Sequence, residues 1–313
     1  MRDETAANEA SFHAGEISLQ REAGVAERLD RAGPQVIRSS LPEQHQEFFP
    51  QLPFLITGSL DQRGQPSASL LAGPPGFAFS PDPGRLRVDG LPSAGSALRA
   101  NLQLGAPLGL LGIQAHTRRR NRVNGRVREL DGAGFCVEVD QSFGNCPKYI
   151  HAREAFYVGV ARPTVAELST QLDARARALI TAADTFYLAS AHPDALESPA
   201  RSHGVDVSHR GGPAGFVHLL GDSTLVVPDF RGNNFFNTLG NLQLHSRAGL
   251  LFMDRARGDL LELEASAELV TSQEPLAGPS ATGRSLHLHV QLARFLPAAS
   301  PLRFGPELSE PRR

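Results

Sequence analysis

An internal repeat is the feature of this sequence that most restricts how the chain can fold. The segment Asn101-Leu-Gln-Leu104 recurs as Asn241-Leu-Gln-Leu244, an offset of 140 positions. The turn segment Gly73-Pro-Pro-Gly-Phe77 recurs in altered form as Gly212-Pro-Ala-Gly-Phe216, an offset of 139. Because the two offsets nearly agree, the two regions are predicted to be two copies of one structural unit.

Two further segments extend the repeat in both directions. Residues 54–59 resemble residues 186–191 at an offset of 132, and residues 107–114 resemble residues 247–254 at an offset of 140. Each copy has the pattern of two strands, a Gly/Pro corner, a hairpin, a helix and two or three long strands. Short strands between Gly, Pro and Asp turns are typical of a small antiparallel barrel. The sequence therefore predicts a mainly β protein with added helices, built from two tandem barrels.

The pattern also predicts several local structures. Apolar residues at helical spacing favour a helix over residues 14–31 that ends at Gly33-Pro34, and a second helix over residues 165–183. Within the copies, helices are expected at residues 93–104 and 233–244, with Ser93 and Asn233 as caps. The dipeptide Asn124-Gly125 lies between alternating residues and predicts a tight hairpin turn there.

These segments divide the chain into five predicted parts. They are an N-terminal helical segment at 1–40, a first barrel at 41–163, a linker helix at 164–184, a second barrel at 185–305 and a tail at 306–313. A chain of 313 residues suits two domains of ordinary size, and 41% hydrophobic residues are enough for a packed core in each.

Charge and composition exclude several classes of function. The net charge is −2, from 31 basic and 33 acidic residues, so no overall field would attract nucleic acid or an anionic membrane. No run of about 18 apolar residues is present and the N-terminus does not resemble a signal peptide, so we expect a cytoplasmic protein. Cys136 and Cys146 lack the spacing of a zinc site, so no metal site is predicted. A disulfide between them is not expected either, because a large core removes the need for one and nothing suggests secretion.

The two copies differ where a strand leads into a helix. The second copy has Arg231, Asn233, Asn234 and Thr238, whereas the first has Leu91, Ser93, Ala94 and Leu98. The second copy also has Ser208-His209-Arg210 where the first has Ser69-Leu70-Leu71. A helix N-terminus favours an anion, and an arginine adds a planar fork that fits two phosphate oxygens. The second copy is thus predicted to bind phosphate and the first to serve for packing, the alternative being ordinary caps beside a solvated arginine.

These segments resemble the pyridoxamine 5'-phosphate oxidase-related FMN-binding split barrels, in an uncharacterised branch of that family. Residues 205–212 and 228–241 are similar to its two cofactor segments, and residues 12–16 and 145–150 are similar to the same branch. The resemblance spans nearly the whole chain and implies six-stranded antiparallel split barrels that pack in pairs, with FMN in the groove between them. It assigns the FMN phosphate to Ser208, His209, Arg210, Arg231, Asn233, Asn234 and Thr238.

Two other features are less specific. Lys148 follows the last strand of the first copy and either approaches the flavin or is an exposed lysine beside a helix-entry proline. The basic stretch at residues 116–126 has three interpretations: a solvated hairpin, an arm that reaches the flavin groove, or a nucleic-acid patch. The last is the weakest, because aromatic residues do not alternate with the basic ones.

The function expected from the resemblance is an FMN-dependent oxidoreductase whose substrate and electron donor are unknown. No catalytic residue is assigned, because a bound flavin performs the redox chemistry itself. The alternatives are a non-catalytic flavin-binding or sensing protein and a haem-binding split barrel, since one fold hosts several ligands. Because two barrels lie in one chain and the first lacks the phosphate-binding residues, a single chain could hold one FMN as the family dimer does. One or two FMN per chain, and a monomer or a homodimer, stay open. The substrate-phosphate groups of true pyridoxamine phosphate oxidases have no clear match, so that reaction is not assigned.

Overall fold

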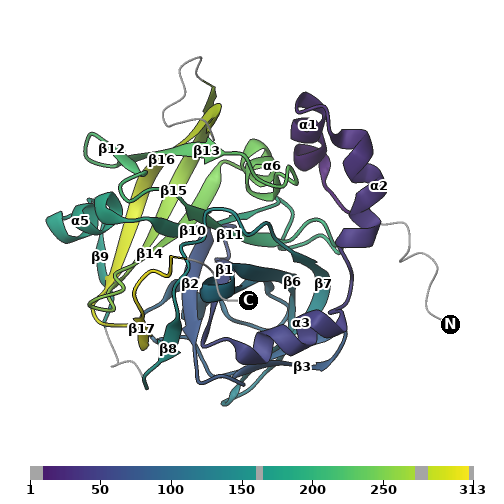
Figure 1. The fold of residues 1–313 in the computed structure, drawn as a ribbon, viewed down its shortest axis with the longest axis horizontal. Coiled ribbons are helices and arrows are strands. Elements are labelled where there is room, and N and C mark those ends of the chain that lie inside the picture. The colour runs from purple at the N-terminus through teal and green to yellow at the C-terminus, as the bar shows by residue number, and fades with distance from the viewer. Residues whose placement is uncertain (1–9, 160–164, 272–280, 310–313) are drawn as a thin grey trace.

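The computed structural model describes residues 10–159, 165–271 and 281–309, which form a mainly β fold of antiparallel sheets (Figure 1). The first sheet has the strand order β2-β1-β5-β6-β7-β4-β3. Its strands are β1 (Phe54–Leu60), β2 (Pro66–Ala72), β3 (Ala78–Asp82), β4 (Arg85–Asp89), β5 (Pro107–Gln114), β6 (Arg119–Leu130) and β7 (Gly134–Gly144).

The second sheet has the same strand order, β11-β10-β14-β15-β16-β13-β12, so that each strand has a counterpart in the first sheet. Its strands are β10 (Thr185–Ala191), β11 (Val205–Gly211), β12 (His218–Leu220), β13 (Thr224–Phe230), β14 (Arg247–Met253), β15 (Leu260–Thr271) and β16 (Ala281–Leu296). A short strand, β9 (Glu167–Ser169), pairs with the end of β16, and β8 (Ala155–Tyr157) pairs separately with β17 (Leu302–Phe304).

Strand pairing corrects the alignment of the two copies by one residue. In the first sheet Gly58 pairs with Gly109, and in the second Ala189 pairs with Gly249. The counterpart of residue 58 is therefore residue 189, an offset of 131 rather than 132. The difference matters because a one-residue shift moves every side chain of a strand to the opposite face.

Six α-helices lie around the sheets, and those near the N-terminus differ from the prediction. They are α1 (Ala14–Glu22), α2 (Ala26–Val36), α3 (Glu43–Phe48), α4 (Ala97–Asn101), α5 (Ala174–Ala182) and α6 (Asn237–Leu244), among the described residues. The single helix predicted for residues 14–31 is two helices, because the chain turns at Gly24 with a left-handed φ of 66°. Gly33-Pro34 does not stop the second one, since Pro34 lies in its last turn.

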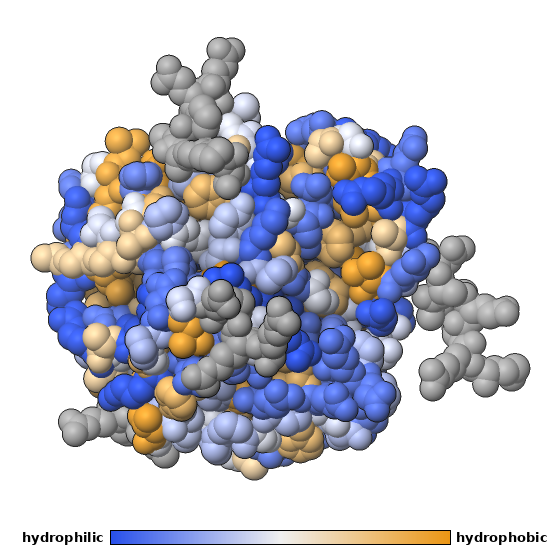
Figure 2. Space-filling model, viewed as in Figure 1, coloured by the Kyte–Doolittle hydropathy of each residue, from blue (hydrophilic) through white to orange (hydrophobic). Residues whose placement is uncertain are grey.

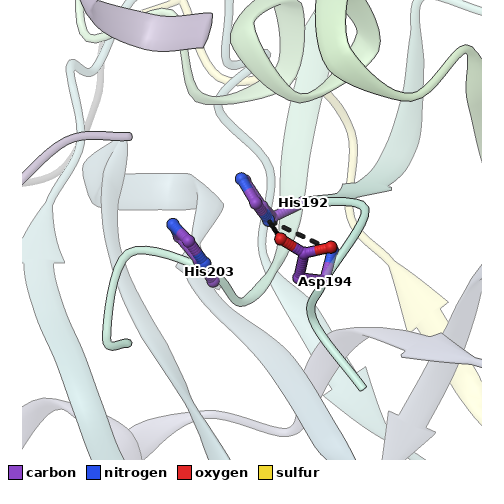
Figure 3. Close-up of side chains that lie close together, drawn as sticks. All are labelled: His192, Asp194 and His203. Carbon is purple, nitrogen blue, oxygen red and sulfur yellow. Dashed lines mark hydrogen bonds and ion pairs between the residues drawn. The ribbon is translucent and has the colours of Figure 1, made fainter. Parts of the chain in front are cut away.

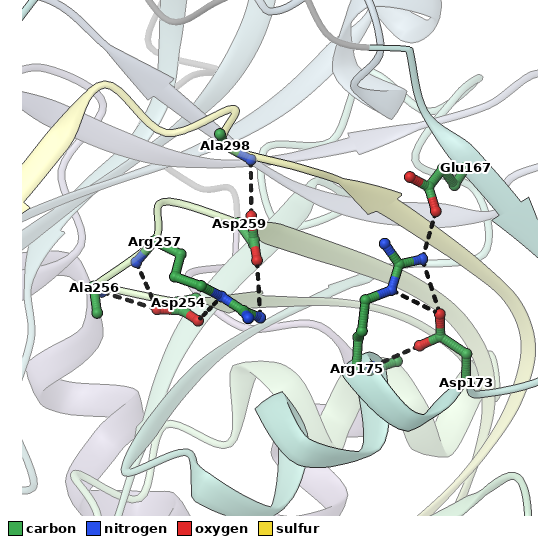
Figure 4. Close-up of polar contacts among 9 residues, drawn as sticks. Glu167, Asp173, Arg175, Asp254, Ala256, Arg257, Asp259 and Ala298 are labelled. Atoms are coloured by element: carbon green, nitrogen blue, oxygen red, sulfur yellow. Dashed lines mark hydrogen bonds and ion pairs between the residues drawn. The ribbon is translucent and has the colours of Figure 1, made fainter.

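The remaining helices start later than the sequence pattern predicts. Helices α4 and α6 each begin four residues after the expected position, so neither Ser93 nor Asn233 is a cap. The loop before α6 cannot be helical, because Asn234 and Phe236 both have a φ of 64°. The linker helix is confined to α5, whose first turn is capped by the Asp173 side chain through the Ala176 N–H (Figure 4).

The hairpin predicted at Asn124-Gly125 is wrong, since both residues lie in the middle of strand β6. The strand is irregular there, and a Cβ at Gly125 would lie 1.9 Å from the Glu138 carbonyl oxygen. Glycine is thus needed for close strand approach rather than for a turn. The chain instead turns between β5 and β6 through a single 3-10 turn and Arg118, whose φ is 57°.

Apolar clusters fill the core of each sheet and the junction between the two sheets. One lies under the first sheet around Phe135 and one under the second around Phe252, and a third joins Ile56 and Leu111 to Ala189 and Leu251 between the sheets. At this junction the repeated glycines allow close contact. A Cβ on Gly109 would lie 2.4 Å from the Val205 carbonyl oxygen, and one on Gly249 would lie 2.5 Å from that of Pro66.

The surface and the chain ends add little to this arrangement. On the face in Figure 2, hydrophobic residues form separate patches among hydrophilic ones. Ion pairs such as Arg257 with Asp254 and Asp259 secure the turn between β14 and β15 (Figure 4).

No helix within the described ranges is long and apolar enough to cross a membrane. Cys136 and Cys146 are both free. Parts of all five predicted segments lie outside the described residues, at 1–9, 160–163, 164, 272–280 and 310–313.

Candidate functional site: a cationic groove between the sheets

A groove between the two sheets takes one wall from each half of the chain. The first half contributes Leu111 from β5, Arg120 and Arg122 from β6, and the segment 145–149 that follows β7. The second half contributes β11, the end of β13, the loop before α6, the start of α6 and part of β16. All eight residues singled out from the sequence line it: Lys148, Ser208, His209, Arg210, Arg231, Asn233, Asn234 and Thr238.

The groove is strongly cationic, although the chain as a whole is nearly neutral. Its lining contains one carboxylate, Asp229, and six basic side chains: Arg120, Arg122, Lys148, Arg210, Arg231 and Arg284. Burial, together with the charges of Arg122 and Arg210, lowers the pKa of Arg120 to about 10, which still leaves its guanidinium protonated near pH 7. An excess of positive charge in one concave surface favours an anionic ligand.

Asp229 neutralises only part of this charge. Its Oδ1 atom lies 3.5 Å from Arg210, and its Oδ2 atom lies 3.4 Å from Arg284. The Thr282 hydroxyl donates a 2.8 Å hydrogen bond to the same Oδ2 atom. The Nε atoms of both arginines are buried and have no hydrogen-bond partner. Buried donors are normally satisfied, so these two atoms leave unused hydrogen-bonding capacity beside the groove.

A hydrogen-bonded network joins the two walls beneath the groove. Arg122, from the first half, donates to Asp206 at 2.6 Å and to the Ser208 hydroxyl at 2.7 Å. The Thr238 hydroxyl donates to the same Ser208 oxygen at 3.0 Å, and Asn241 donates to Asp206 at 2.8 Å. Strands β6 and β11 and helix α6 are thereby fixed relative to one another.

One part of the groove wall is aromatic. Tyr149 stacks on Phe230 with ring centroids 5.2 Å apart, and its hydroxyl donates to the Arg231 carbonyl oxygen at 3.1 Å. The Tyr149 backbone packs so closely on β11 that a Cβ on Gly211 would lie 2.1 Å from its carbonyl oxygen. Segment 145–149, from the first half, is therefore an integral wall of the groove, and the helix that would make Pro147 a helix-entry residue is absent there.

His209 also lines the groove. Burial and the nearby charge of Arg120 hold the pKa of its imidazole well below the usual range, so it is neutral near pH 7. Its Nδ1 atom is buried without a hydrogen-bond partner, and its ring meets Tyr187 edge to face. A neutral imidazole offers one donor and one acceptor to a ligand.

Helix α1 supports the loop and helix that border the groove. Gly15 of α1 crosses Gly240 of α6 so closely that a Cβ on Gly15 would lie 2.2 Å from the Gly240 carbonyl oxygen. The Glu16 carboxylate accepts a 2.5 Å hydrogen bond from the Asn237 side chain, and Gln20 donates to the Phe235 carbonyl oxygen at 3.2 Å. The N-terminal helix thus positions the start of α6 and the strained loop before it.

The sequence pattern located the groove but identified only part of its lining. Among the residues it picked out, Arg231 and Lys148 are exposed at the rim, Thr238 is buried and the others are partly buried. The groove residues it missed include Arg120, Asn145, Tyr149, Asp229 and Arg284. Arg120 and Arg122 belong to the basic stretch, which favours its interpretation as an arm that reaches the groove.

A histidine cluster lies outside the groove, in the loop after β10 (Figure 3). His192, Asp194 and His203 lie close enough together to hold a metal ion, a cluster that the sequence reading did not find. The rings of His192 and His203 stack face to face with centroids 3.6 Å apart, and Nδ1 of His192 already accepts a hydrogen bond from the Asp194 N–H. Because a nitrogen lone pair lies in the ring plane, stacked rings do not direct two ligand atoms at one point.

Comparisons with known proteins give similar structures only. Among models of known protein families none matches the chain, and no curated protein matches it. One similar solved structure is a protein from Lactobacillus delbrueckii provisionally named a pyridoxamine 5'-phosphate oxidase, with 16% identity and a TM-score of 0.31. A second is an FMN-binding protein from Syntrophomonas wolfei, with 11% identity and a TM-score of 0.27. A third is HutZ, the haem storage protein from Vibrio cholerae, with 10% identity and a TM-score of 0.26. The matches cover 40%, 38% and 39% of this chain and 94%, 86% and 93% of those proteins. Each is thus matched over most of its length by less than half of this chain.

Proposed function

We propose that this protein binds FMN in the groove between its two sheets, and that these sheets are tandem split barrels. The observation that carries the proposal is the groove itself, where six basic side chains and one carboxylate lie beside an aromatic wall. A flavin mononucleotide combines an anionic phosphate with a flat aromatic ring. The groove therefore offers each part of the ligand a chemically matched surface.

The unsatisfied groups of the groove support this fit. Among the groove residues, the side-chain nitrogens that are buried without a hydrogen-bond partner include Nε of Arg210, Nε of Arg284 and the amide nitrogen of Asn145. Within the proposal Arg210, Arg231 and the hydroxyls of Ser208 and Thr238 hold the phosphate. Asn145 and Lys148, which come from the other wall, face the rest of the ligand.

We further propose that the bound protein acts as an FMN-dependent oxidoreductase, with a small-molecule substrate or electron donor still to be identified. A bound flavin supplies hydride and one-electron chemistry. The side chains of this chain bind and orient it, and the wall built by Tyr149 and Phe230 shields one side from water. No proton transfer by a protein group is required.

Haem is the second candidate, and one observation favours it. His209 presents a neutral imidazole at the groove, and its Nδ1 has no partner. A neutral imidazole is a common axial ligand of haem iron. The positive lining would then hold the haem propionates in place of a phosphate.

An absorbance spectrum and a titration separate these candidates. The purified protein is mixed with FMN, riboflavin or haemin, and binding is followed by flavin fluorescence and by the Soret band. We expect FMN to bind at least tenfold more tightly than riboflavin, because riboflavin lacks the phosphate. Haemin binding with a Soret band and no flavin binding would support the second candidate. Bleaching of the bound flavin by NADH or NADPH would distinguish an oxidoreductase from a passive binder.

A further inference from the structure

A second position, equivalent to the contact between Arg122 and Ser208, lies on the other side of the junction between the two sheets. In the first sheet Leu111 pairs with Arg122, and in the second Leu251 pairs with Glu262, so Glu262 is the counterpart of Arg122. By the same reasoning Ser69 is the counterpart of Ser208. Ser69 pairs with Thr57 on β1, and Ser208 pairs with Leu188, the equivalent residue on β10.

The contacts at the two positions correspond, but their charges are opposite. In the cationic groove Arg122 crosses from the first half and donates to Ser208, beside the start of α6. At the second position Glu262 crosses from the second half and accepts a 2.6 Å hydrogen bond from the Ser69 hydroxyl. Its other oxygen accepts a 2.9 Å hydrogen bond from the Ala97 N–H, at the first residue of α4.

We propose that Glu262 is a built-in anion that occupies the second position, so that the chain binds one external anion rather than two. The buried carboxylate takes the serine hydroxyl and the helix N–H that would otherwise face a ligand. Arg294 lies 3.4 Å from it and supplies a cation. Removing this carboxylate should expose an anion site formed by Ser69, Ala97 and Arg294.

The surroundings of Glu262 support this role. The counterparts of the phosphate-type groups are apolar here, since Leu70, Leu71 and Leu98 replace His209, Arg210 and Thr238. A small hollow already lies beside the carboxylate, lined by Ser67, Ala97, Leu263, Glu264, Leu292 and Arg294. The inference concerns a position outside the cationic groove and holds whatever ligand that groove takes.

Ionisation of Glu262 sets the conditions of the test. Burial raises the pKa of its carboxyl to about 7, whereas the hydrogen bonds from Ser69 and Ala97 and the charge of Arg294 lower it. The other ionisable group facing it is Glu264, whose pKa burial also raises. At pH 8 the carboxylate is therefore the dominant form, and the experiments are best done there.

The test is phosphate binding by the full chain and its variants, measured by equilibrium dialysis at pH 8 and constant ionic strength. Glu262→Ala should bind one phosphate more per chain than the wild type, and Glu262→Gln, which fills the same space, should not. Adding Ser69→Ala to Glu262→Ala should weaken this extra site. Arg231→Ala, in the cationic groove, should leave it unchanged, which separates this result from that of the proposed function.

If Glu262→Ala is too unstable for dialysis, phosphate binding is measured through its effect on thermal unfolding. Phosphate, but not an equal ionic strength of chloride, should then raise its thermal midpoint more than that of the wild type, because a ligand stabilises the state it binds. An equal number of phosphate ions bound by the wild type and Glu262→Ala, with no larger phosphate-dependent shift, would overturn the proposal.

Discussion

Single residues of the cationic groove differ in whether they hold the fold or only face the ligand. Arg122 is buried in a network with Asp206 and Ser208, so its removal would disturb the junction of the two halves. Arg231 is exposed, and its carbonyl oxygen accepts a hydrogen bond from the Tyr149 hydroxyl. Its side chain is therefore the cleaner test of phosphate recognition.

Arg231→Ala should weaken FMN binding by roughly tenfold to a hundredfold. A hydrogen bond to a charged group contributes about 1.5–3 kcal/mol, and about 1.4 kcal/mol corresponds to a tenfold change in dissociation constant. Riboflavin should bind both forms equally. Arg99→Ala, at an exposed position on α4, is the matched control and should leave FMN affinity unchanged. A flavin fluorescence titration in which Arg231→Ala loses riboflavin as severely as FMN would refute the phosphate role.

His13 should make stability depend on pH. Burial and the neighbouring His192 and His203 lower its pKa from 6.5 to about 4, although Asp206 opposes them. Because the folded-state pKa lies below the unfolded value, the stabilising contribution is complete above pH 6.5 and is lost as the pH falls towards 4. Glu16 is the other ionisable group in direct contact with it.

Urea unfolding between pH 8 and pH 4.5 tests this dependence. His13→Asn, which retains a side-chain acceptor for the Gly15 N–H, should show a flatter profile than the wild type. The exposed His218→Asn serves as the control. Parallel profiles for all three proteins would show that His13 does not contribute to the pH dependence.

At the scale of elements, the repeated glycines of β5 and β14 explain part of the repeat. Gly109→Ala should destabilise the protein by about 1–3 kcal/mol, because its Cβ would meet the Val205 backbone, which cannot rotate away. Gly132→Ala is the control, as nothing lies within 4 Å of its Cβ position. Equal denaturant midpoints for the two variants would contradict the close approach of the sheets at Gly109.

The strands could be predicted from the sequence, whereas irregular elements could not. Strand β1 lies where the pattern of strands and turns in the first copy places a strand, since short strands and the turns between them are local signals. The hairpin turn predicted at Asn124-Gly125 was wrong because a glycine that permits close strand approach cannot be distinguished in the sequence from one that permits a turn. The start of α6 was misplaced because the left-handed residues Asn234 and Phe236 precede it in a loop held by α1.

The groove lining shows the same division. His209, Arg210 and Arg231 could be selected because the other copy has leucines in their place, which is a comparison within the sequence. Arg284 and Tyr149 could not be selected, since only the packing of distant strands brings them to the groove. The negative charge of Glu262 could not be related to Arg122 from the sequence either, because only the strand register shows that the two residues are counterparts.

At the scale of the whole molecule, both walls of the groove belong to one chain. Leu111, Arg120 and Tyr149 come from the first half, and Arg210, Thr238 and Arg284 come from the second. We therefore expect a single chain to bind ligand without a partner subunit. A homodimer, if it forms, would use another surface.

Sedimentation velocity of the protein with FMN, followed at the visible absorption band of the flavin, tests whether a single chain binds FMN. We expect one flavin per chain to sediment with a species of about the mass of a single chain, 33.6 kDa, across a wide range of protein concentrations. Flavin that sediments only with a dimer, and is released on dilution as the dimer dissociates, would contradict it.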